Sequence, residues 1–273
     1  MSEREIGMPA LTGLLEEIFA RYHYDFRGYA GASLTRRLRA ALAHFHCDSI
    51  AELQPLVLGD PRVFTQLLRF LTVQVSELFR DPPYYRAIRE QVVPYLRTYP
   101  SLKLWVAGCA TGEEAYSLAI LLAEEGLLDR ARIYATDIHP ESLRIAENGI
   151  YDVDRFARAS QAYLEAGGLG SLSNHYTARY ASAVLDRRLR SAILFSDHSL
   201  ATDSAFAEVQ LVSCRNVLIY FERELQDRAI GVLRDSLCRR GFLGLGLKET
   251  LRCSAHAAAF AEFSRDERIY QRI

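Results

Sequence analysis

The sequence predicts a small all-helical N-terminal domain followed by a doubly wound α/β domain. Three observations lead to this prediction. Residues 10–70 carry apolar side chains at helical spacing and include no segment typical of a strand. From about residue 100, short apolar runs that end in glycine or aspartate alternate with amphipathic stretches, the pattern of a parallel sheet covered by helices on both faces. The length of 273 residues is enough for two domains of modest size.

The N-terminal region is expected to contain four helices. Apolar side chains between Leu11 and Phe19 fall on one stripe of the first helix. Ser33 is a candidate N-cap for the second helix, because its hydroxyl can accept a hydrogen bond from the first turn. Pro61 stands at the first position of the fourth helix, where its missing N–H is tolerated. The expected helices span residues 11–22, 33–45, 49–58 and 61–72.

The later part of the chain is expected to alternate strands with helices and to end in a hairpin. Apolar runs predict the strands, and amphipathic stretches that stop at glycine or start at proline predict the helices. Strands are expected at 102–108, 131–138, 191–197, 209–216 and 241–247, and helices at 113–126, 140–149 and 222–237. The segments 260–266 and 268–273 are expected to pair as an antiparallel edge of the sheet.

These patterns divide the chain into domains. The all-α domain is expected to span residues 1–81, a linker helix residues 82–99, and the α/β domain residues 100–273. Within 150–190 the alternation lapses, and a glycine-rich stretch is followed by alternating aromatic and β-branched residues. This change favours a small antiparallel β insert.

Composition and charge limit the functional classes. Apolar residues make up 49% of the chain and charged residues 25%, as is typical of a soluble globular protein. The net charge of −1 argues against a nucleic-acid or anionic membrane partner. No apolar run approaches the roughly 20 residues that a membrane span needs, and the N-terminal stretch MSEREIGMP lacks the pattern of a secretory leader. We therefore expect a cytoplasmic protein without direct membrane insertion, and we also expect it to be a monomer.

The cysteines and histidines do not indicate a metal site. The five cysteines are odd in number, and no two form a CxxC pair, which indicates reduced thiols and no structural zinc. His44, His46 and Cys47 stand close together in the segment HFHC. Because positions i and i+2 of a helix face apart, this segment is not expected to bind a metal.

The segment GCATGEEAY, residues 108–116, follows the first predicted strand and opens a helix. Gly108 and the glycine four positions later allow a ligand to approach the backbone closely, as in dinucleotide-binding loops. Glu113 and Glu114 stand where a pyrophosphate would bind, and they would repel it. They fit a ligand with a cationic end and no phosphate, such as S-adenosylmethionine, and Asp137 after the second strand is placed to accept hydrogen bonds from ribose hydroxyls. The alternative is that both acids only complement the helix dipole.

Five segments together carry a resemblance to a known family: YDFRGYAGASLTRRL, LTVQVSELFRD, GCATGEEAYSLA, ATDIHPESLRIAENGIY and CRNVLIYF. In this order they resemble the chemotaxis receptor methyltransferases, the CheR family, and the resemblance covers residues 11–273 approximately. It implies a class I methyltransferase fold, which is a Rossmann-like doubly wound sheet with an antiparallel C-terminal edge and a small β insert, preceded by an all-α domain. It also implies methyl transfer from S-adenosylmethionine, with S-adenosylhomocysteine as product, to glutamate side chains of the cytoplasmic helical domain of a methyl-accepting chemoreceptor or similar signalling protein.

The resemblance further implies roles for individual residues. Arg80 and Tyr220 match an active-site arginine and tyrosine of the family. Glu114 matches the residue that contacts the methionine end of the cofactor, and Asp137 matches the acid that holds the ribose. The other residues at cofactor-binding positions, with Arg80 among them, are Gln74, Ser76, Gly108, Ser199, Leu200, Arg215 and Asn216.

Two positions depart from the family pattern. Gln74 and Ser199 stand where asparagine is common. Glutamine keeps the amide on a longer side chain, whereas serine loses the two amide donors. Each contact to the cofactor is expected to weaken by about 1 kcal/mol, the net contribution of one hydrogen bond. These departures motivate an alternative function, a regulatory module that senses S-adenosylmethionine or its demethylated product with little turnover.

For the implied reaction, the protein mainly has to position the glutamate carboxylate. A glutamate nucleophile has a pKa of about 4.3 and is ionised near neutral pH without a general base. Arg80 is suited to orient it with a planar fork, the alternative being an ion pair with Asp81. Arg36, Arg37 and Arg39 either meet an acidic helical substrate or form a solvated face.

The β insert and the helical domain also bear on the substrate. The insert is suited to pair with an extended peptide by strand addition. A small-molecule methyltransferase is disfavoured, because the helical domain matches a protein-modifying family. Nucleic-acid methylation is disfavoured, because the chain has no aromatic base-stacking motif.

Overall fold

A computed structural model describes residues 6–273. Residues 1–5, which are part of the N-terminal stretch without a leader pattern, lie outside the described residues. The chain forms two compact units. The first holds residues up to Gln74 with Leu200–Thr202 and Tyr220–Ala229, and the second holds Val75–Ser199, Asp203–Ile219 and Ile230–Ile273.

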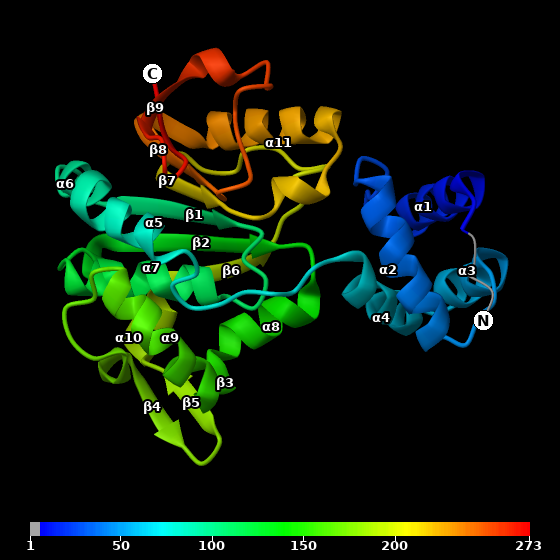
Figure 1. Ribbon diagram of the computed structural model, residues 1–273, viewed down its shortest axis with the longest axis horizontal. Helices are drawn as coiled ribbons and strands as arrows, with labels where there is room; N and C mark the ends of the chain where they lie inside the picture. Colours follow the sequence, from blue (N-terminus) through cyan, green and yellow to red (C-terminus); the bar gives the residue numbers. More distant parts are fainter. Residues whose placement is uncertain (1–5) are drawn as a thin grey trace. The chain divides into compact units, whose positions relative to one another are not determined.

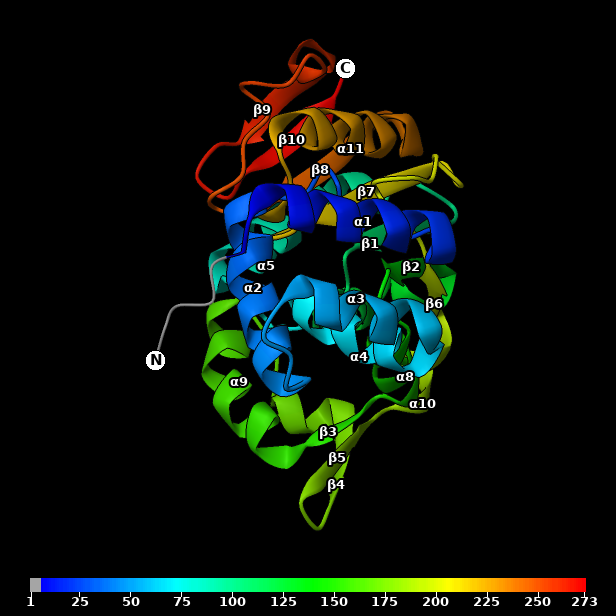
Figure 2. The ribbon, with the colours of Figure 1, turned by 90° about the vertical axis from the view of Figure 1, so that its right-hand side faces the viewer.

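The first unit is built on four helices, as predicted: α1 (Met8–Tyr22), α2 (Gly31–His44), α3 (Ile50–Gly59) and α4 (Pro61–Leu71). Helix α3 packs against α1 and α4, and α2 packs against α4 (Figure 2). Their apolar stripes form the core, with Leu14, Ile18, Leu38 and Leu67 fully buried. Because each helix buries one face only, the unit depends on this packing rather than on helix propensity.

Side chains cap the first turns of α3 and α4, whereas α1 and α2, within residues 6–273, begin without a side-chain cap. The side chain of Asp60 accepts a hydrogen bond from the Arg62 N–H and caps α4, and Ser49 caps α3 in the same way. The prediction that Ser33 caps α2 is wrong, because α2 begins one turn earlier, after Ala30. The Ser33 hydroxyl instead accepts a hydrogen bond of 2.8 Å from Arg37.

The second unit is organised around a mixed sheet of seven strands (Figure 1). The strand order is β6 (Ile193–Asp197), β2 (Ala131–Asp137), β1 (Leu102–Ala107), β7 (Val209–Cys214), β8 (Leu237–Leu245), β10 (Ile269–Arg272) and β9 (Phe260–Ser264). The first five strands are parallel, and β10 is antiparallel to both β8 and β9. This arrangement confirms the predicted fold class, including its antiparallel C-terminal edge.

Helices pack against the sheet, and the register of the strands sets where their carboxyl ends lie. Helices α7 (Glu113–Glu124), α8 (Pro140–Asn148) and α10 (Arg187–Ala192) pack against β2, and the last helix is α11 (Arg223–Ser236). Residues Leu104, Trp105 and Val106 of β1 are buried, as expected for the central strand of a parallel sheet. The register of the parallel pairs brings Asp137 of β2 beside Asp197 of β6, so the carboxyl ends of the strands meet at one edge.

The region between β2 and β6 contains a small antiparallel sheet of β3 (Ile150–Asp152), β5 (Ser182–Leu185) and β4 (Tyr176–Arg179), in that order. This is the predicted β insert. The sequence did not predict helix α9 (Val153–Glu165), which lies within it. Asp152 caps α9 by accepting a hydrogen bond from the Asp154 N–H.

The linker is not one regular helix. It consists of α5 (Pro82–Ala87), a π-helical segment over Ile88–Val92 and α6 (Val93–Leu96). The Val93 N–H donates to the carbonyl of Ile88, five residues earlier. Pro94 has no N–H to continue the α-helical ladder, which accounts for the interruption at this point.

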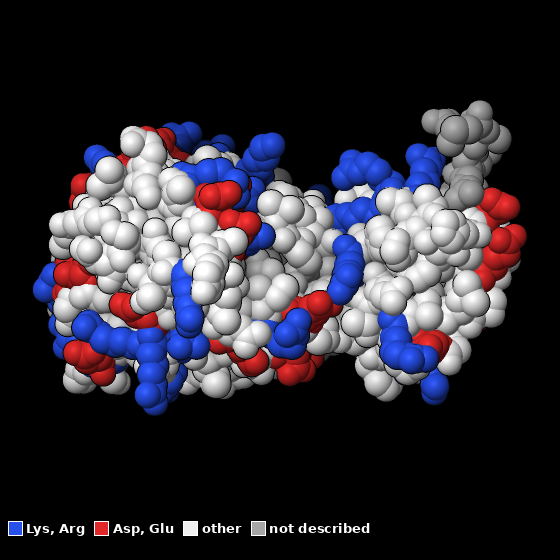
Figure 3. Space-filling view, turned by 90° about the horizontal axis from the view of Figure 1, so that it is seen from below, with Lys and Arg blue, Asp and Glu red and all other residues white. Residues whose placement is uncertain are grey.

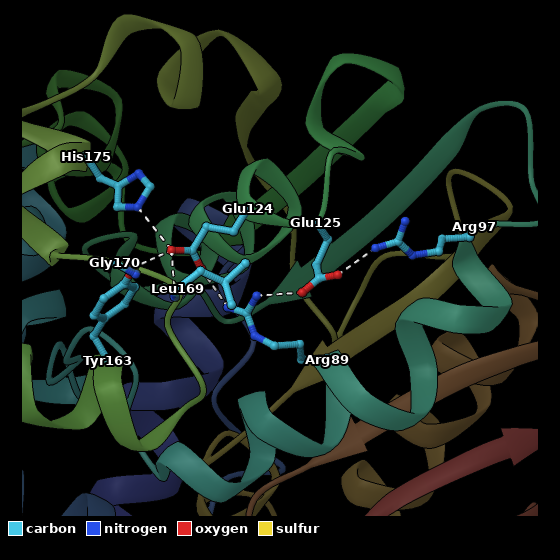
Figure 4. Close-up of polar contacts among 8 residues, drawn as sticks. All are labelled: Arg89, Arg97, Glu124, Glu125, Tyr163, Leu169, Gly170 and His175. Carbon is cyan, nitrogen blue, oxygen red and sulfur yellow. Dashed lines mark hydrogen bonds and ion pairs between the residues drawn. The ribbon is translucent and has the colours of Figure 1, made fainter.

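A buried ionic cluster joins the linker to the end of α7 and to the insert (Figure 4). Arg89 lies 2.7 Å from Glu124 and 2.6 Å from Glu125. The Tyr163 hydroxyl and the Leu169 N–H donate to Glu124, the Gly170 N–H donates to Tyr163, His175 lies 3.5 Å from Glu124, and Arg97 lies 2.7 Å from Glu125. These contacts tie three separate segments together.

The surface of the protein carries charged side chains of both signs (Figure 3). Basic and acidic side chains are interspersed over the left-hand part of the face drawn in Figure 3. Within residues 6–273, no helix is both long enough and apolar enough to cross a bilayer.

Candidate functional site

The loop between β1 and α7 has a backbone that requires glycine at two positions. Gly108 has a φ of 73° and Gly112 a φ of 94°, both in the left-handed region. A Cβ at Gly108 would collide with the Val217 side chain, and one at Gly112 would lie 2.7 Å from the Cβ of Ala146. The N–H of Gly108 donates to the Thr136 carbonyl at 2.8 Å, so the loop is fastened to the end of β2.

Asp137 at the end of β2 lies directly against this loop. Its carboxylate accepts hydrogen bonds from the N–H of Ala110 at 2.8 Å and from the N–H of His139 at 2.9 Å. The residue is buried. Asp137 therefore fixes the glycine loop to the strand end, and it stands where the sequence predicts a ribose contact.

The two acids at the start of α7 have different surroundings. Glu113 is buried, and its oxygens accept from the Thr111 hydroxyl at 2.7 Å and from Arg155 at 2.5 Å. Burial raises the pKa of Glu113, while hydrogen bonds from Thr111 and Ser76 and the charge of Arg155 act against that shift. Glu113 is thus occupied in holding α7 to α9. Ser76, predicted to lie near the cofactor, contacts this residue.

Glu114 carries an unsatisfied buried oxygen. Its Oε1 is sealed from solvent and has no hydrogen-bond partner within the described part of the chain. Burial raises the pKa of Glu114, and the charge of Arg215, a hydrogen bond from Ser213 and the charge of Arg80 lower it. A buried carboxylate oxygen without a donor is costly. The ammonium group of a bound ligand would supply that donor, so Glu114 fits a cofactor with a cationic end.

Arg80 lies in a strained turn before α5. Phe79 has a φ of 55° and Asp81 a φ of 56°, which is unusual for residues with side chains and an outlier for a bulky one. Phe79 is fully buried, and its N–H donates to the Ser117 hydroxyl of α7 at 2.9 Å. Strain of this kind collects at functional sites, where the surroundings hold it in place.

The loop after β7 carries Arg215 and Asn216. The Arg215 guanidinium pairs with Asp81 at 2.7 Å and lies over the ring of Tyr84, 4.0 Å from its centroid. Asn216 has a φ of 60°, and its N–H donates to Glu249 at 2.9 Å. Both predicted residues therefore lie at the carboxyl edge of the sheet, close to the turn that carries Arg80.

Glu249 organises this loop, and sequence reasoning missed it. Its buried carboxylate accepts backbone hydrogen bonds from Asn216 at 2.9 Å, Leu218 at 2.8 Å, Ile219 at 3.3 Å and Gly246 at 2.6 Å. The segment GLKET contains one acid beside one lysine, and nothing in that pattern distinguishes a buried acid from a solvated one.

The remaining predicted site residues are divided between the two units. The N–H of Ser199 donates to the Asp203 carboxylate at 2.9 Å, in the turn that follows β6. Gln74, Leu200 and Tyr220 belong to the first unit and are described within it. There Leu200 is buried and the Gln74 amide donates to the Thr72 hydroxyl at 2.8 Å.

Tyr220 has a basic neighbour within the first unit. The guanidinium of Arg37 lies over its ring, 4.8 Å from the centroid. The carbonyl of Tyr220 accepts a hydrogen bond of 2.8 Å from the Ala30 N–H. The other predicted residues belong to the second unit, and they are Ser76, Arg80, Gly108, Glu114, Asp137, Ser199, Arg215 and Asn216. Over residues 6–273, no group of His, Cys, Asp and Glu side chains is arranged to hold a metal ion.

Comparisons with known proteins cover both units. The family model described as CheR methyltransferase, SAM binding domain, matches residues 74–267, and the model described as CheR methyltransferase, all-alpha domain, matches residues 9–72. The first of these descriptions names the cofactor, S-adenosylmethionine, that the acidic glycine loop predicts.

Individual relatives agree with the family models. A protein of Pseudomonas putida KT2440, provisionally named methyltransferase Cher3, is 53% identical over 259 residues, covering 95% of each chain. The chemotaxis protein methyltransferase of Listeria innocua is 29% identical and covers 83% of this chain and 84% of that protein. Among solved structures, magnesium protoporphyrin IX methyltransferase of Synechocystis PCC 6803 with bound SAM is 19% identical with a TM-score of 0.37, covering 77% of this chain and 91% of that one.

Proposed function

Because the chain belongs to the CheR methyltransferase family, we propose that it transfers the methyl group of S-adenosylmethionine to glutamate side chains of a receptor-type signalling protein. S-adenosylmethionine-dependent methyl transfer is the activity of this family. The glutamate acceptor and the receptor are our proposal. Relatives named chemotaxis protein methyltransferase support it.

The observation that carries the proposal is the buried, unpartnered Oε1 of Glu114 at the start of α7. A pyrophosphate ligand would leave this oxygen unsatisfied and would be repelled by it. An ammonium group would satisfy it with a charge-assisted hydrogen bond. Its neighbour Glu113 is already saturated by Thr111 and Arg155, so we assign the direct contact to Glu114 alone.

The other groups around the loop complete the proposed cofactor site. We assign the ribose hydroxyls to Asp137, and close backbone approach to the loop at Gly108. Ser76, Ser199 and Asn216 supply polar contacts from the surrounding turns, and we assign Gln74 and Leu200 to the same site by resemblance. When bound, S-adenosylmethionine supplies an electrophilic methyl group on a sulfonium.

The protein then has to orient a nucleophile that is already ionised. A glutamate carboxylate has a pKa of about 4.3 and needs no general base near neutral pH. We assign to Arg80 the orientation of that carboxylate through its planar fork, and to Tyr220 a hydrogen-bonding or lining role. Holding the reacting atoms about 3 Å apart and excluding water account for the rate advantage.

Helix α2 offers a contact for an acidic helical substrate. Arg37 is half-buried and donates to the Leu71 carbonyl and to the Ser33 hydroxyl. Arg36 and Arg39 are exposed and stand three positions apart, on one face of the helix. We assign substrate contact to these two residues, and a structural role to Arg37.

The experiment that tests the proposal is transfer of label from methyl-tritiated S-adenosylmethionine to receptor cytoplasmic fragments. A glutamyl ester releases its label as methanol in alkali, whereas a methylated amine keeps it. We expect alkali-labile label with the wild-type chain and loss of that label with Arg80→Ala. Arg144→Ala is the matched control, because the Arg144 side chain is 66% exposed and lies 3.9 Å from Glu141, a long contact for an ion pair.

Two outcomes would contradict the proposal. Label that resists alkali would place the methyl group on another acceptor. Cofactor binding without label on any receptor fragment would favour the sensing module instead.

A further inference from the structure

The second half of the glycine loop is bound by the β insert. The hydroxyl of Tyr151, on strand β3 of the insert, donates a hydrogen bond of 2.6 Å to the Thr111 carbonyl. Tyr151 is buried, and a Cβ at Gly112 would lie 3.2 Å from its hydroxyl. The side chain of Tyr151 therefore fills the space beside the loop and fastens the backbone of the turn that precedes α7.

Helix α9 of the insert binds the same turn a second time. Arg155, in the first turn of α9, lies 2.5 Å from Glu113 Oε1, and only 2% of the Glu113 side chain is exposed. The other oxygen of Glu113, Oε2, accepts a hydrogen bond of 2.7 Å from the Thr111 hydroxyl. Thr111 is thus held at its carbonyl by one residue of the insert and at its hydroxyl by a chain of contacts that starts from another.

The two halves of the loop have different anchors. Strand β2 holds the first half, where the N–H groups of Gly108 and Cys109 both donate to the Thr136 carbonyl. The second half, residues 111–113, leads directly into α7, so its position sets where Glu114 stands. A segment that contains two glycines loses much conformational entropy when it is fixed. Contacts that fix it before the cofactor binds remove that cost from the binding step.

Packing inside the insert fixes Tyr151 in turn. Tyr151 pairs with Ala183 of β5 in the small antiparallel sheet. The ring of Phe156, which is fully buried on α9, lies 6.2 Å from the ring of Tyr151, centroid to centroid. The same ring lies 4.2 Å from that of Tyr176 on the edge strand β4. A continuous line of aromatic contacts therefore connects the edge of the insert with the residue that binds the loop.

We propose that Tyr151 and Arg155 are positioning residues, through which the β insert holds the glycine loop in the conformation that binds S-adenosylmethionine. They act through Thr111 and Glu113. This role rests on the proposed function, because the loop is positioned for the contact that Glu114 makes with the cofactor. Coupling between two sites is reciprocal, so the bound cofactor also stabilises the insert.

Conservative substitutions remove each contact separately. Tyr151→Phe removes one hydroxyl. Tyr176→Phe is its matched control, because Tyr176 belongs to the same insert and packs on Phe156. Arg155→Met removes the charge beside Glu113, and Arg155→Lys restores a cation at that position. Arg158→Met is the matched control, because Arg158 is an exposed arginine of the same helix.

Three measurements follow the effect of each variant. Calorimetric titration with S-adenosylhomocysteine gives the affinity, amide hydrogen exchange gives the local stability, and thermal unfolding gives the stability of the fold. We expect Tyr151→Phe and Arg155→Met each to lose about fivefold in affinity, the scale of one hydrogen bond. Both should also speed exchange over residues 108–116 in the free protein.

The controls and the wild type have expected results of their own. Arg155→Lys should keep the wild-type affinity within about twofold, since a cation can still donate to the carboxylate. Tyr176→Phe and Arg158→Met should bind as the wild type does. In the wild type, S-adenosylhomocysteine should slow exchange over residues 150–156 as well as over the loop.

Three other results would overturn the inference. Wild-type affinity in both Tyr151→Phe and Arg155→Met, together with a lower melting temperature, would mean that the contacts only stabilise the fold. An equal loss of affinity in Tyr176→Phe would assign the effect to the insert as a whole. Exchange over residues 150–156 that S-adenosylhomocysteine leaves unchanged would show that the insert and the loop are not coupled.

The design separates this inference from misfolding and from the proposed function. If thermal unfolding shows that Arg155→Met is misfolded, Tyr151→Phe and the exchange of the wild type decide. Failure of the proposed function has a different signature. The wild-type chain would then bind S-adenosylhomocysteine, the differences between the variants would remain, and no receptor fragment would be labelled.

Discussion

Replacing Glu124 by glutamine tests the buried ionic cluster that joins the linker, α7 and the insert. The side chain of Glu124 is 8% exposed, and that of its partner Arg89 is 9% exposed. Burial alone would raise the pKa of Glu124, but hydrogen bonds from His175, Tyr163 and Arg89 outweigh it and lower the pKa from 4.5 to about 2. Glutamine keeps the size of the side chain and removes the charge.

The magnitude follows from this shift in pKa. A difference of about 2.5 pKa units corresponds to about 3 kcal/mol of folding free energy. Because the pKa is depressed in the folded state, this contribution is complete above pH 4.5 and is lost as the pH falls through 2. The linkage relation predicts a loss of about 1 kcal/mol by pH 4 and about 2 kcal/mol by pH 3.

The assay is urea unfolding followed by the fluorescence of Trp105. This is the only tryptophan of the chain, and it is fully buried in β1, so it reports on the second unit. We expect Glu124→Gln to destabilise this unit by about 3 kcal/mol at pH 7. The difference in unfolding free energy between the variant and the wild type should become smaller below pH 4.5. Glu90→Gln is the matched control, because Glu90 is exposed in the same linker segment, and it should change stability by less than about 0.5 kcal/mol. A difference in unfolding free energy below about 1 kcal/mol at pH 7, or a difference that stays the same below pH 4.5, would refute the reasoning.

Three further predictions concern the site. Gly108→Ala should abolish S-adenosylhomocysteine binding in calorimetry, because its Cβ would collide with Val217 and the φ of 73° is strained for alanine; binding as in the wild type would contradict this. Glu249→Gln should lower the melting temperature and the affinity for S-adenosylhomocysteine together, since an amide cannot accept four backbone N–H groups as a carboxylate does; a drop in only one of the two would contradict it. Replacing Arg36 and Arg39 together by glutamate should raise the KM for an acidic receptor fragment about tenfold without changing the KM for the cofactor, and an unchanged receptor KM would assign both residues to a solvated face.

Much of the fold could be predicted because apolar periodicity and strand ends are local signals. The glycine loop, the acid that ends β2 and the alternation of strands and helices all follow from short segments, and the family matches confirm the resemblance and the cofactor. The irregular parts depend on contacts that no local pattern carries. Helix α9 has polar residues on most of its surface, and its core face is set by the insert into which it packs.

The same limit applies to the candidate site. The residue types around the loop did not separate Glu113 from Glu114, and only the family resemblance singled out Glu114, because the partner that occupies Glu113 is Arg155, 42 residues away. It could not place Arg215 inside the protein either, because the burial of its side chain depends on Asp81, 134 residues earlier in the chain. Residue types indicated which side chains gather at the strand ends, and the three-dimensional contacts distinguish those that are already saturated from those that can receive a ligand.

The most direct test of the central claim is the affinity of S-adenosylmethionine for the chain with Glu114 replaced by glutamine. Calorimetry near pH 7 should give a loss of at least about tenfold, equivalent to 1.4 kcal/mol, for a buried charge-assisted contact. The same substitution at Glu141, an acid in the first turn of α8, should leave the affinity unchanged. Wild-type affinity in Glu114→Gln would contradict the claim that this carboxylate selects a cationic methyl donor.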